Sequence, residues 1–379
     1  MSNLRKNMIS RTAVLLAAGC LSLIAVSPFA LAQVAPPQYK VDPYWPKELP
    51  NNWIVGQIGG MSVDSQNHIW VLQRPGSNTP DEISADPSSP RHAMCCLPAP
   101  PVLEFDTEGN LLKSWGGPGA GYDWPGVEHG IYVDKAGNVW IGGNGPNDRQ
   151  VLKFTNDGKF LKQLGHPSKE SVNSADTTIL GRPAGLEIDE AAHELYISDG
   201  YMNKRVIVYD TDTLAFKRMW GAYGNVPNDA DPGPYKGKGN APIDQQFRSP
   251  VHCTHVSVDG LVYVCDRSND RVQIFTKQGK FLKEFFVHPE TLEPGTVCDI
   301  VFSHDPGQEY ILVADDTDNV IWTLRRSDGT VVGMFGHNGR NVGQFHAIHQ
   351  LVSDSYGNLY EGEVETGKRV QKFVLVSGK

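Results

Sequence analysis

Three histidines stand at the same place in alternate copies of an internal repeat, and they are the residues best suited to do chemistry. His129, His252 and His349 each lie eight residues before the glycine of the first turn of their copy. If the repeats close into a ring, alternate copies are a third of a turn apart, so three imidazoles converge on its axis. A single histidine is more often a satisfied core residue, but this alternation favours a metal site. Three neutral imidazoles with an open fourth position suit Zn²⁺, although Cu, Fe or Mn also accept such ligands.

The repeat itself predicts the scaffold that positions these histidines. Each copy is a series of short alternating strands separated by Asp-Gly or Gly-Asn turns, without an amphipathic helix of note. The copies span 59–116, 129–165, 184–221, 252–286, 297–336 and 349–374. The copies without a histidine carry Gly59, Ala184 and either Val297 or Cys298 at its position. This pattern predicts an all-β, six-bladed β-propeller with four-stranded blades.

The last copy has only three strands, and the segment before the first copy can supply the fourth. Residues 53–59 resemble the outer strand 160–165, so we expect this N-terminal strand to close the last blade and to remove exposed sheet edges. The expected organisation is a signal peptide over 1–32, an N-terminal extension over 33–52 and a propeller over 53–379.

One face of this propeller is expected to carry the site. The long loops between blades, the histidines and the ends of the second strands all fall on the same face, and long loops on a rigid scaffold favour a binding surface. Arg74, Tyr201 and Arg267 end second strands and are not demanded by the repeat, so we expect them beside the histidines. The repeat's own pattern of Asp, Asn and Arg, as in Asp199, Asn203 and Arg205, is expected to be structural. His255 should face away from His252, and His346 is a candidate to support a ligand.

The N-terminus and the charge indicate where the protein works. Basic residues, an apolar run and Ala-Leu-Ala before Gln33 predict a cleaved secretory signal, with lipoprotein processing at Cys20 as the alternative. We therefore expect a periplasmic or secreted protein without a membrane span. The chain carries a formal charge of −9, and the remainder after cleavage carries −12. With no basic patch, this charge makes a nucleic-acid partner unexpected. A small-molecule or peptide-like substrate is expected, and the oligomeric state is not predicted.

The cysteines leave their pairing open. Five remain after cleavage, so at least one stays free or pairs unusually. Cys95 and Cys96 lie in a Pro/Ser-rich insertion over 76–100 and form either a vicinal disulfide or one bridge and a free thiol. A two-residue turn would place Cys253 and Cys265 on opposite faces of their hairpin, so their pairing requires a bulge or a different turn.

The segments that contain the three histidines and Tyr201 resemble those of a known family. The segments around His129, His252 and His349 look like the zinc-binding segments of peptidyl-α-hydroxyglycine α-amidating lyase, an NHL-type six-bladed propeller. The segment 199–205 looks like the one that carries the catalytic tyrosine of that family, which corresponds to Tyr201 here. Arg74 and Arg267 fall where the family has active-site arginines. The resemblance covers the whole expected propeller and implies cleavage of the C–N bond of a carbinolamide.

The chain also departs from that family. Met202 stands where the family has a disulfide cysteine, and Gln350 stands where an Asp helps to hold a structural Ca²⁺, which puts that ion in doubt here. The resemblance includes no hydroxylase domain, so we expect the chemistry to transfer more readily than the substrate.

The sequence thus predicts an exported metal-dependent lyase of the carbinolamide type. Two alternatives stay open: a metal-dependent ester or lactone hydrolase on the same scaffold, and a non-catalytic NHL binding propeller. The fold by itself does not decide among them.

Overall fold

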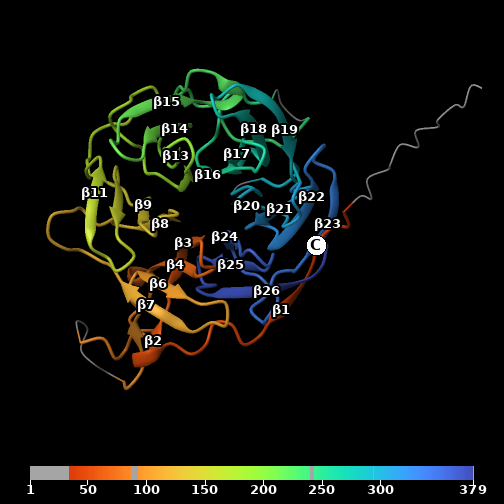
Figure 1. Ribbon diagram of the computed structural model, residues 1–379. Helices are drawn as coiled ribbons and strands as arrows, with labels where there is room; N and C mark the ends of the chain where they lie inside the picture. Colours follow the sequence, from red (N-terminus) through yellow and green to blue (C-terminus); the bar gives the residue numbers. More distant parts are fainter. Residues whose placement is uncertain (1–33, 88–92, 240–242, 293, 379) are drawn as a thin grey trace, which may run out of the picture. The chain divides into compact units, whose positions relative to one another are not determined.

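The computed structural model describes residues 34–87, 93–239, 243–292 and 294–378. They form six four-stranded antiparallel sheets arranged in a ring, which confirms the six-bladed, all-β propeller (Figure 1). The predicted signal peptide and the lipoprotein alternative at Cys20 lie outside the described residues. Within the described part of the chain, no helix is long and apolar enough to cross a membrane.

Five blades are built from strands in chain order, from the axis outwards. Blade one contains β3 (Gln57–Val63), β4 (Ile69–Arg74), β6 (Val102–Phe105) and β7 (Leu111–Trp115). Blade two contains β8 (Glu128–Val133), β9 (Val139–Gly143), β10 (Val151–Phe154) and β11 (Phe160–Leu164). Blade three contains β12 (Gly185–Asp189), β13 (Glu194–Asp199), β14 (Arg205–Asp210) and β15 (Phe216–Trp220).

The remaining strands complete the ring. Blade four contains β16 (Val251–Val256), β17 (Leu261–Asp266), β18 (Arg271–Thr276) and β19 (Phe281–Phe286). Blade five contains β20 (Asp299–Phe302), β21 (Tyr310–Asp315), β22 (Val320–Arg325) and β23 (Val331–Phe335). Blade six contains β24 (Ile348–Ser353), β25 (Leu359–Glu363), β26 (Val370–Ser377) and β1 (Gln38–Asp42). Short 3-10 turns cover η1 (Pro50–Asn52), η2 (Pro75–Ser77), η3 (Ala222–Gly224) and η4 (Arg267–Asn269).

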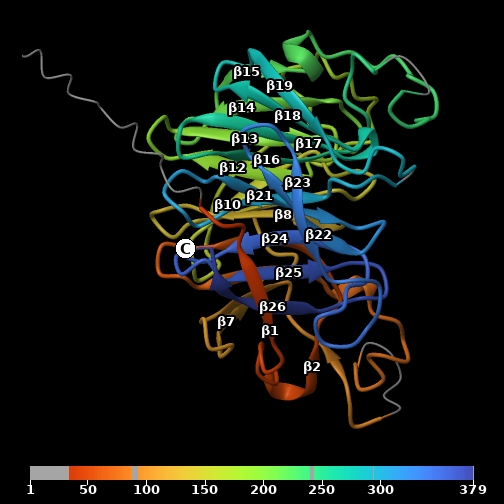
Figure 2. The ribbon, with the colours of Figure 1, turned by 90° about the vertical axis from the view of Figure 1, so that its right-hand side faces the viewer.

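Blade six is closed by an N-terminal strand, as predicted, but the strand is not 53–59. β1 pairs antiparallel with β26, with Val41 opposite Phe373, and Figure 2 shows the two strands side by side. Trp53 and Ile54 instead form β2, which pairs in parallel with β5 (Leu97–Pro98), and β3 begins at Gln57. The closing strand therefore falls in the segment assigned to an N-terminal extension.

Close backbone packing explains why 53–59 leads into an inner strand. A Cβ added at Gly59 would lie 2.4 Å from the carbonyl oxygen of Glu128 in the next blade. Only glycine allows two inner strands to approach this closely. By contrast, Tyr39 and Val41 alternate with polar residues and pack on the apolar cluster between blades five and six, which suits an edge strand.

The apolar core lies between neighbouring blades. Each cluster of buried side chains joins the facing sheets of two blades, as Trp70 of β4 and Ile141 of β9 do between blades one and two. Burial of these faces is the main favourable contribution to folding. A blade cannot bury its faces alone, so the ring stabilises all six together.

The pattern of Asp, Asn and Arg is structural, as expected. One carboxylate oxygen of Asp199 accepts bonds from Asn203 Nδ2 at 2.7 Å and Arg205 Nε at 2.9 Å, and the other accepts the backbone N–H of Gly181. Arg205 also donates to the carbonyl oxygen of Ile179 at 2.8 Å. The motif therefore fixes the loop between blades two and three, and Asp266 and Arg271 repeat the arrangement in blade four.

Replacement of Arg205 by Met should destabilise the protein by about 3–5 kcal/mol, because it leaves the fully buried Asp199 carboxylate without its partner. The measurement is the free energy of unfolding in denaturant. The matched control is Arg325→Met, which breaks an exposed pair with Asp328 and should cost less than about 1 kcal/mol. Equal effects of the two substitutions would contradict the structural role of the motif.

Candidate metal centre

Each of the three histidines sits where the pairing of its strand shifts. The register between the first and second strands changes between Glu128 and Ile131, between Val251 and Cys253, and between Ile348 and Gln350. Such a shift marks a β-bulge, which turns a side chain away from the regular alternation of a strand. The inner strands of blades three and five pair with their neighbours without a shift. The local irregularity therefore belongs to the blades that carry the histidines, and to blade one at Gly59.

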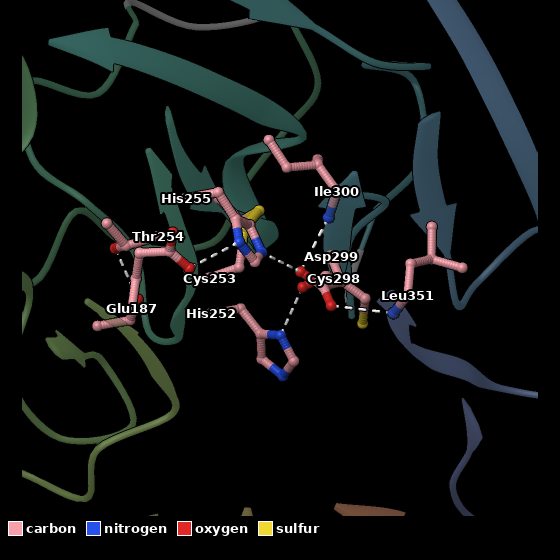
Figure 3. Close-up of a disulfide and its surroundings, with 11 residues drawn as sticks. Glu187, His252, Cys253, Thr254, His255, Cys298, Asp299, Ile300 and Leu351 are labelled. Atoms are coloured by element: carbon pink, nitrogen blue, oxygen red, sulfur yellow. Dashed lines mark hydrogen bonds and ion pairs between the residues drawn. A yellow bond between two sulfur atoms is a disulfide. The ribbon is translucent and has the colours of Figure 1, made fainter. Parts of the chain in front are cut away.

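Each imidazole is held by the main chain of the following blade. His129 Nδ1 lies 2.9 Å from the carbonyl oxygen of Ala184, and His349 Nδ1 lies 3.1 Å from that of Ile58. His252 Nδ1 lies 2.6 Å from the carbonyl oxygen of Cys298, and a dashed line marks this contact in Figure 3. Since a carbonyl oxygen can only accept, each Nδ1 must carry the proton and donate it. Each Nε2 is then unprotonated, which is the form that binds a metal.

The three rings meet in a buried cluster. Their centroids are 5.0 Å apart between His129 and His252, 4.7 Å between His129 and His349, and 4.8 Å between His252 and His349. Each offers a nitrogen, and these atoms lie within 4.8 Å of one another. The donor set fits a divalent transition metal bound by three imidazoles.

The surroundings keep the imidazoles neutral. Burial lowers the pKa of His252 to about 3, and the charge of Arg267 contributes in the same direction. Burial also lowers the pKa values of His129 and His349 well below the usual value, with further contributions from neighbouring imidazoles and from Arg74. Neutral imidazole is the ligand form, so no proton has to leave before a metal binds at neutral pH.

Tyr201 joins this cluster as predicted. Its hydroxyl oxygen lies 2.9 Å from His129 Nε2 and 3.2 Å from His252 Nε2. The tyrosine follows β13 through Gly200, where an added Cβ would lie 2.1 Å from the carbonyl oxygen of Val251. Glycine at this position lets the end of the strand approach blade four and place the phenol over the axis. Burial raises the pKa of Tyr201, while the charges of Arg267 and Arg74 lower it.

Arg74 and Arg267 also lie close enough for their charges to lower the pKa values of the histidines. Arg74 Nε donates to the carbonyl oxygen of Glu128 at 2.7 Å, and its Nη1 donates to Gln57 Oε1 at 2.8 Å. Its Nη2 is buried and has no hydrogen-bond partner among the described residues. Arg267 opens η4, and its Nη1 lies 4.0 Å from a carboxylate oxygen of Asp316.

Three further residues border the site, and none of them was among the predicted site residues. Arg182 places its guanidinium 5.5 Å from the ring centroid of Tyr201. Cys298 is the buried free cysteine among those described, and its thiol interacts with the carboxyl group of Asp316 and with Arg267. The odd cysteine count predicted a free thiol, and the repeat pattern placed either Val297 or Cys298 at the position of the histidines without deciding between them.

His255 and His346 do not join the centre. His255 Nε2 lies 2.8 Å from a carboxylate oxygen of Asp299, and its Nδ1 lies 3.4 Å from one of Glu187 (Figure 3). Its separation from His252 agrees with the predicted opposite orientation. The ring of His346 contacts Thr366 Oγ1 at 3.0 Å instead of supporting a ligand.

The turn of the blade-four hairpin settles the pairing of Cys253 with Cys265. The register is unbroken from the pair Val256 and Val262 to the pair Cys253 and Cys265, and the two cysteines form a disulfide. A two-residue turn gives the wrong register, whereas here three residues, 258–260, separate Ser257 from Leu261, whose backbone groups are hydrogen-bonded. The bulge at His252 lies beyond Cys253 and does not set this pairing. Cys95 and Cys96 form the vicinal disulfide, one of the two pairings considered. Cys253 lies next to His255 and Asp299, and the three together could in principle hold a metal ion. Because the sulfur of Cys253 is in the disulfide, it cannot act as a thiolate ligand, and His255 and Asp299 form an ion pair with each other.

Comparison with known proteins agrees with the resemblance. The chain is 25% identical over 325 residues to peptidyl-glycine alpha-amidating monooxygenase B of Xenopus laevis, a match that covers 82% of this chain and 33% of that protein. It is 27% identical over 248 residues to NHL repeat-containing protein 3 of Mus musculus, covering 64% and 57%. A probable peptidyl-alpha-hydroxyglycine alpha-amidating lyase of Caenorhabditis elegans is 23% identical over 222 residues, covering 59% and 56%.

These matches confirm the similarity to NHL-repeat and amidating-lyase propellers. The chain spans about a third to just over half of the length of these relatives. No protein-family model matches it. Among solved structures, a Bacteroides thetaiotaomicron protein of unknown function aligns with a TM-score of 0.52 at 16% identity, covering 85% of this chain and 70% of that one. That likeness supports the fold alone.

The ion pair at His255 should make stability depend on pH. Burial lowers the pKa of His255, but Asp299 and Glu187 outweigh it and raise the pKa to about 10. Since this folded-state value exceeds the unfolded value of about 6.5, the stabilisation is complete below about pH 6.5 and is lost as pH rises towards 10. The free-energy difference between the unaltered protein and His255→Gln should therefore be largest at pH 6 and shrink by pH 10.

The control for this measurement is His166→Gln, because His166 forms an exposed pair with Asp123. Its effect should be small at every pH. A His255→Gln effect that stays constant from pH 6 to pH 10 would show that His255 is not charged in the folded protein.

Proposed function

We propose that this chain is an exported metal-dependent lyase that breaks a carbinolamide-type C–N bond, or a related C–X bond, in a small or peptide-like substrate. The observation that carries the proposal is the meeting of three imidazoles beside Tyr201, whose hydroxyl contacts Nε2 of His129 and of His252. Three imidazoles and an adjacent proton-transfer group are the parts that activation of a carbinol hydroxyl needs. The similarity to amidating lyases supports the choice of a C–N bond.

His129, His252 and His349 would hold the ion, with Zn²⁺ the first candidate. When bound, a divalent ion supplies Lewis acidity to an oxygen ligand and a positive charge that favours the phenolate form of Tyr201. The main-chain carbonyls of the following blades hold the three rings in place, so the ligands are oriented before any ion arrives.

Tyr201 would move the proton. As the phenolate it accepts the proton of the carbinol hydroxyl, and the O–H electron pair forms the new carbonyl group as the C–N bond breaks. The electrons of that bond go to nitrogen, and Tyr201 returns the proton there, which regenerates the phenolate. Arg267 and Arg74 favour the phenolate that this cycle requires. The unpartnered Nη2 of Arg74 is available to hold a carboxylate or carbonyl oxygen of the substrate.

The metal site is tested by elemental analysis of protein purified without chelators. We expect about one transition-metal ion per chain in the unaltered protein and none after combined replacement of His129, His252 and His349 by Ala, because removal of the ligands removes the site. The matched control is His255→Ala, which removes a half-buried histidine outside the cluster and should keep the metal. A chain without metal, whose thermal stability does not respond to zinc, would contradict the proposal and favour a binding propeller.

The proton-transfer role is tested by Tyr201→Phe. This substitution should lower turnover of a carbinolamide by about 10²–10⁴-fold while the metal content stays the same, because it removes only the hydroxyl. Tyr132→Phe removes a hydroxyl bound to the carbonyl of Ile188, away from the centre, and should leave turnover unchanged. Full activity of Tyr201→Phe would show that another group transfers the proton.

A further inference from the structure

A cavity of about 700 Å³ adjoins the candidate centre at Arg74. It lies between the segment that follows β4, the end of the insertion before β6 and the loops that precede β8. Most of its wall is apolar or backbone. The lining residues that matter most are Trp53, Arg74, Gly76, Pro98, Pro101 and Val127. The volume is in the range of sites that enclose a small organic molecule.

The walls of this cavity are fixed by main-chain and side-chain bonds. The insertion returns to blade one through β5, where Leu97 and Pro98 lie beside Trp53 and Ile54. The backbone N–H of Ala99 donates to the carbonyl oxygen of Ile54 at 2.9 Å. Four consecutive wall positions, 98–101, contain three prolines, which have restricted backbones and no N–H group to satisfy. The pocket is therefore largely pre-formed.

The side chain of Gln73 also holds the wall of the cavity in place through two hydrogen bonds. Its Nε2 donates to the carbonyl oxygen of Ala99 at 2.7 Å, and its Oε1 accepts the backbone N–H of Gly56 at 2.7 Å. The side chain is fully buried. One amide thus links the end of the insertion, β4 and the chain between β2 and β3, so residues 97–100 form part of the rigid blade.

The cavity has one cationic residue, Arg74, among its lining. Two bonds hold the guanidinium, to the carbonyl oxygen of Glu128 and to Gln57 Oε1, and both of these residues also line the cavity. The remaining nitrogen, Nη2, is buried without a partner among the described residues. A buried donor that lacks an acceptor costs free energy, so a ligand oxygen at this place is favoured.

Arg74 also connects the cavity to the histidines. Its positive charge contributes to the lowered pKa values of all three imidazoles and acts on Tyr201. Arg74 Nε also donates to the carbonyl oxygen of Glu128, the residue before His129, so the Arg74 end of the cavity is the end nearer the candidate centre. A ligand that contacts Arg74 and fills the cavity has an oxygen acceptor next to an apolar group.

We propose that this cavity is the specificity pocket of the enzyme and that it binds the apolar group of a substrate whose neighbouring carboxylate or carbonyl oxygen is held by Arg74. The substrate class is a small acyl compound with an aliphatic or aromatic body. This assignment rests on the proposed function for the identity of the ligand as substrate, but the pocket itself is defined by the contacts above. The Pro-rich insertion then has a role in selecting the apolar group.

The pocket is tested with simple carboxylates of increasing length, from acetate through butyrate and hexanoate to octanoate, by isothermal titration calorimetry on the full chain. Burial of each additional methylene should tighten binding by roughly three- to fourfold until the cavity is full. Arg74→Met should weaken hexanoate binding at least tenfold and remove the preference for hexanoate over hexanamide. An affinity that does not change with chain length would overturn the proposal.

A substitution that fills the cavity provides the second arm. Gly76 lines the pocket, and a Cβ added there meets no atom within 4 Å, so Gly76→Trp can place an indole inside it without a backbone clash. This variant should weaken hexanoate binding at least tenfold and leave the metal content unchanged. The matched control is Gly333→Trp on the outer strand β23, where the added Cβ meets only Thr323 at 3.9 Å, and hexanoate should bind as before.

Unchanged binding by folded Gly76→Trp would overturn the pocket assignment. The length series in the unaltered protein tests the proposal even if that variant does not fold. Because binding is measured without turnover, the two proposals can fail separately. Length-dependent binding in a protein that holds no metal would leave the pocket standing and reject the lyase, whereas a metal-bound, active enzyme without length dependence would do the reverse.

Discussion

The hydrogen bond from each histidine Nδ1 to a main-chain carbonyl of the next blade is the interaction on which the centre depends. Blade two is tied to blade three, blade four to blade five, and blade six to blade one. The last of these bonds, from His349 to Ile58, joins residues from opposite ends of the propeller. The three Nε2 atoms can therefore face one another only when the ring is closed. The hydrogen bond from His349 to Ile58 orients a ligand and also links the last blade to the first.

This arrangement gives the alternating pattern a physical reason. Blades two, four and six supply an imidazole, and blades one, three and five supply the carbonyl that holds it. The bulges at the histidines turn the rings towards the axis. Glycines such as Gly59 and Gly200 let neighbouring strands approach closely enough for these bonds. Each pair of neighbouring blades thus supplies one histidine and the carbonyl that orients it, which is why a histidine occurs in every second copy of the repeat.

The charges around the centre keep its three histidines neutral. Arg74 and Arg267 disfavour protonated imidazole, and burial acts in the same direction, so the histidines are kept in the form that binds metal. The same arginines favour an anionic Tyr201 and can hold an anionic or carbonyl-bearing ligand. Asp316 lies beside Arg267 and Cys298, and the carboxyl group partly balances the positive charge on that side. Neutral nitrogen ligands, a phenol and two cations are a combination suited to a substrate that loses a proton.

The sequence was sufficient for the features that repeat and insufficient for those that depend on a single irregularity. The blade pattern, the three histidines and the positions of Tyr201, Arg74 and Arg267 follow from the spacing of the copies. The closing strand was placed at 53–59 because its pattern resembles an outer strand, whereas the close approach at Gly59 was visible only in the structure.

Two other features depend on details that the repeat pattern does not fix. The disulfide between Cys253 and Cys265 follows from a turn of three residues, and an Asp-Gly pair occurs in hairpin turns of either length. The position of Cys298 beside Asp316, and the cavity under the insertion, arise from packing between segments that no local pattern links. Such contacts become predictable only after the ring and its register are known.

The central claim is that the three imidazoles form a metal site on the axis, and X-ray absorption spectroscopy of protein loaded with one equivalent of zinc tests it most directly. The account predicts imidazole scattering from three nitrogen ligands, with an additional oxygen, at about 2.0–2.1 Å, and no sulfur ligand. A shell of oxygen ligands without imidazole scattering, or a sulfur ligand at about 2.3 Å from Cys298, would contradict it.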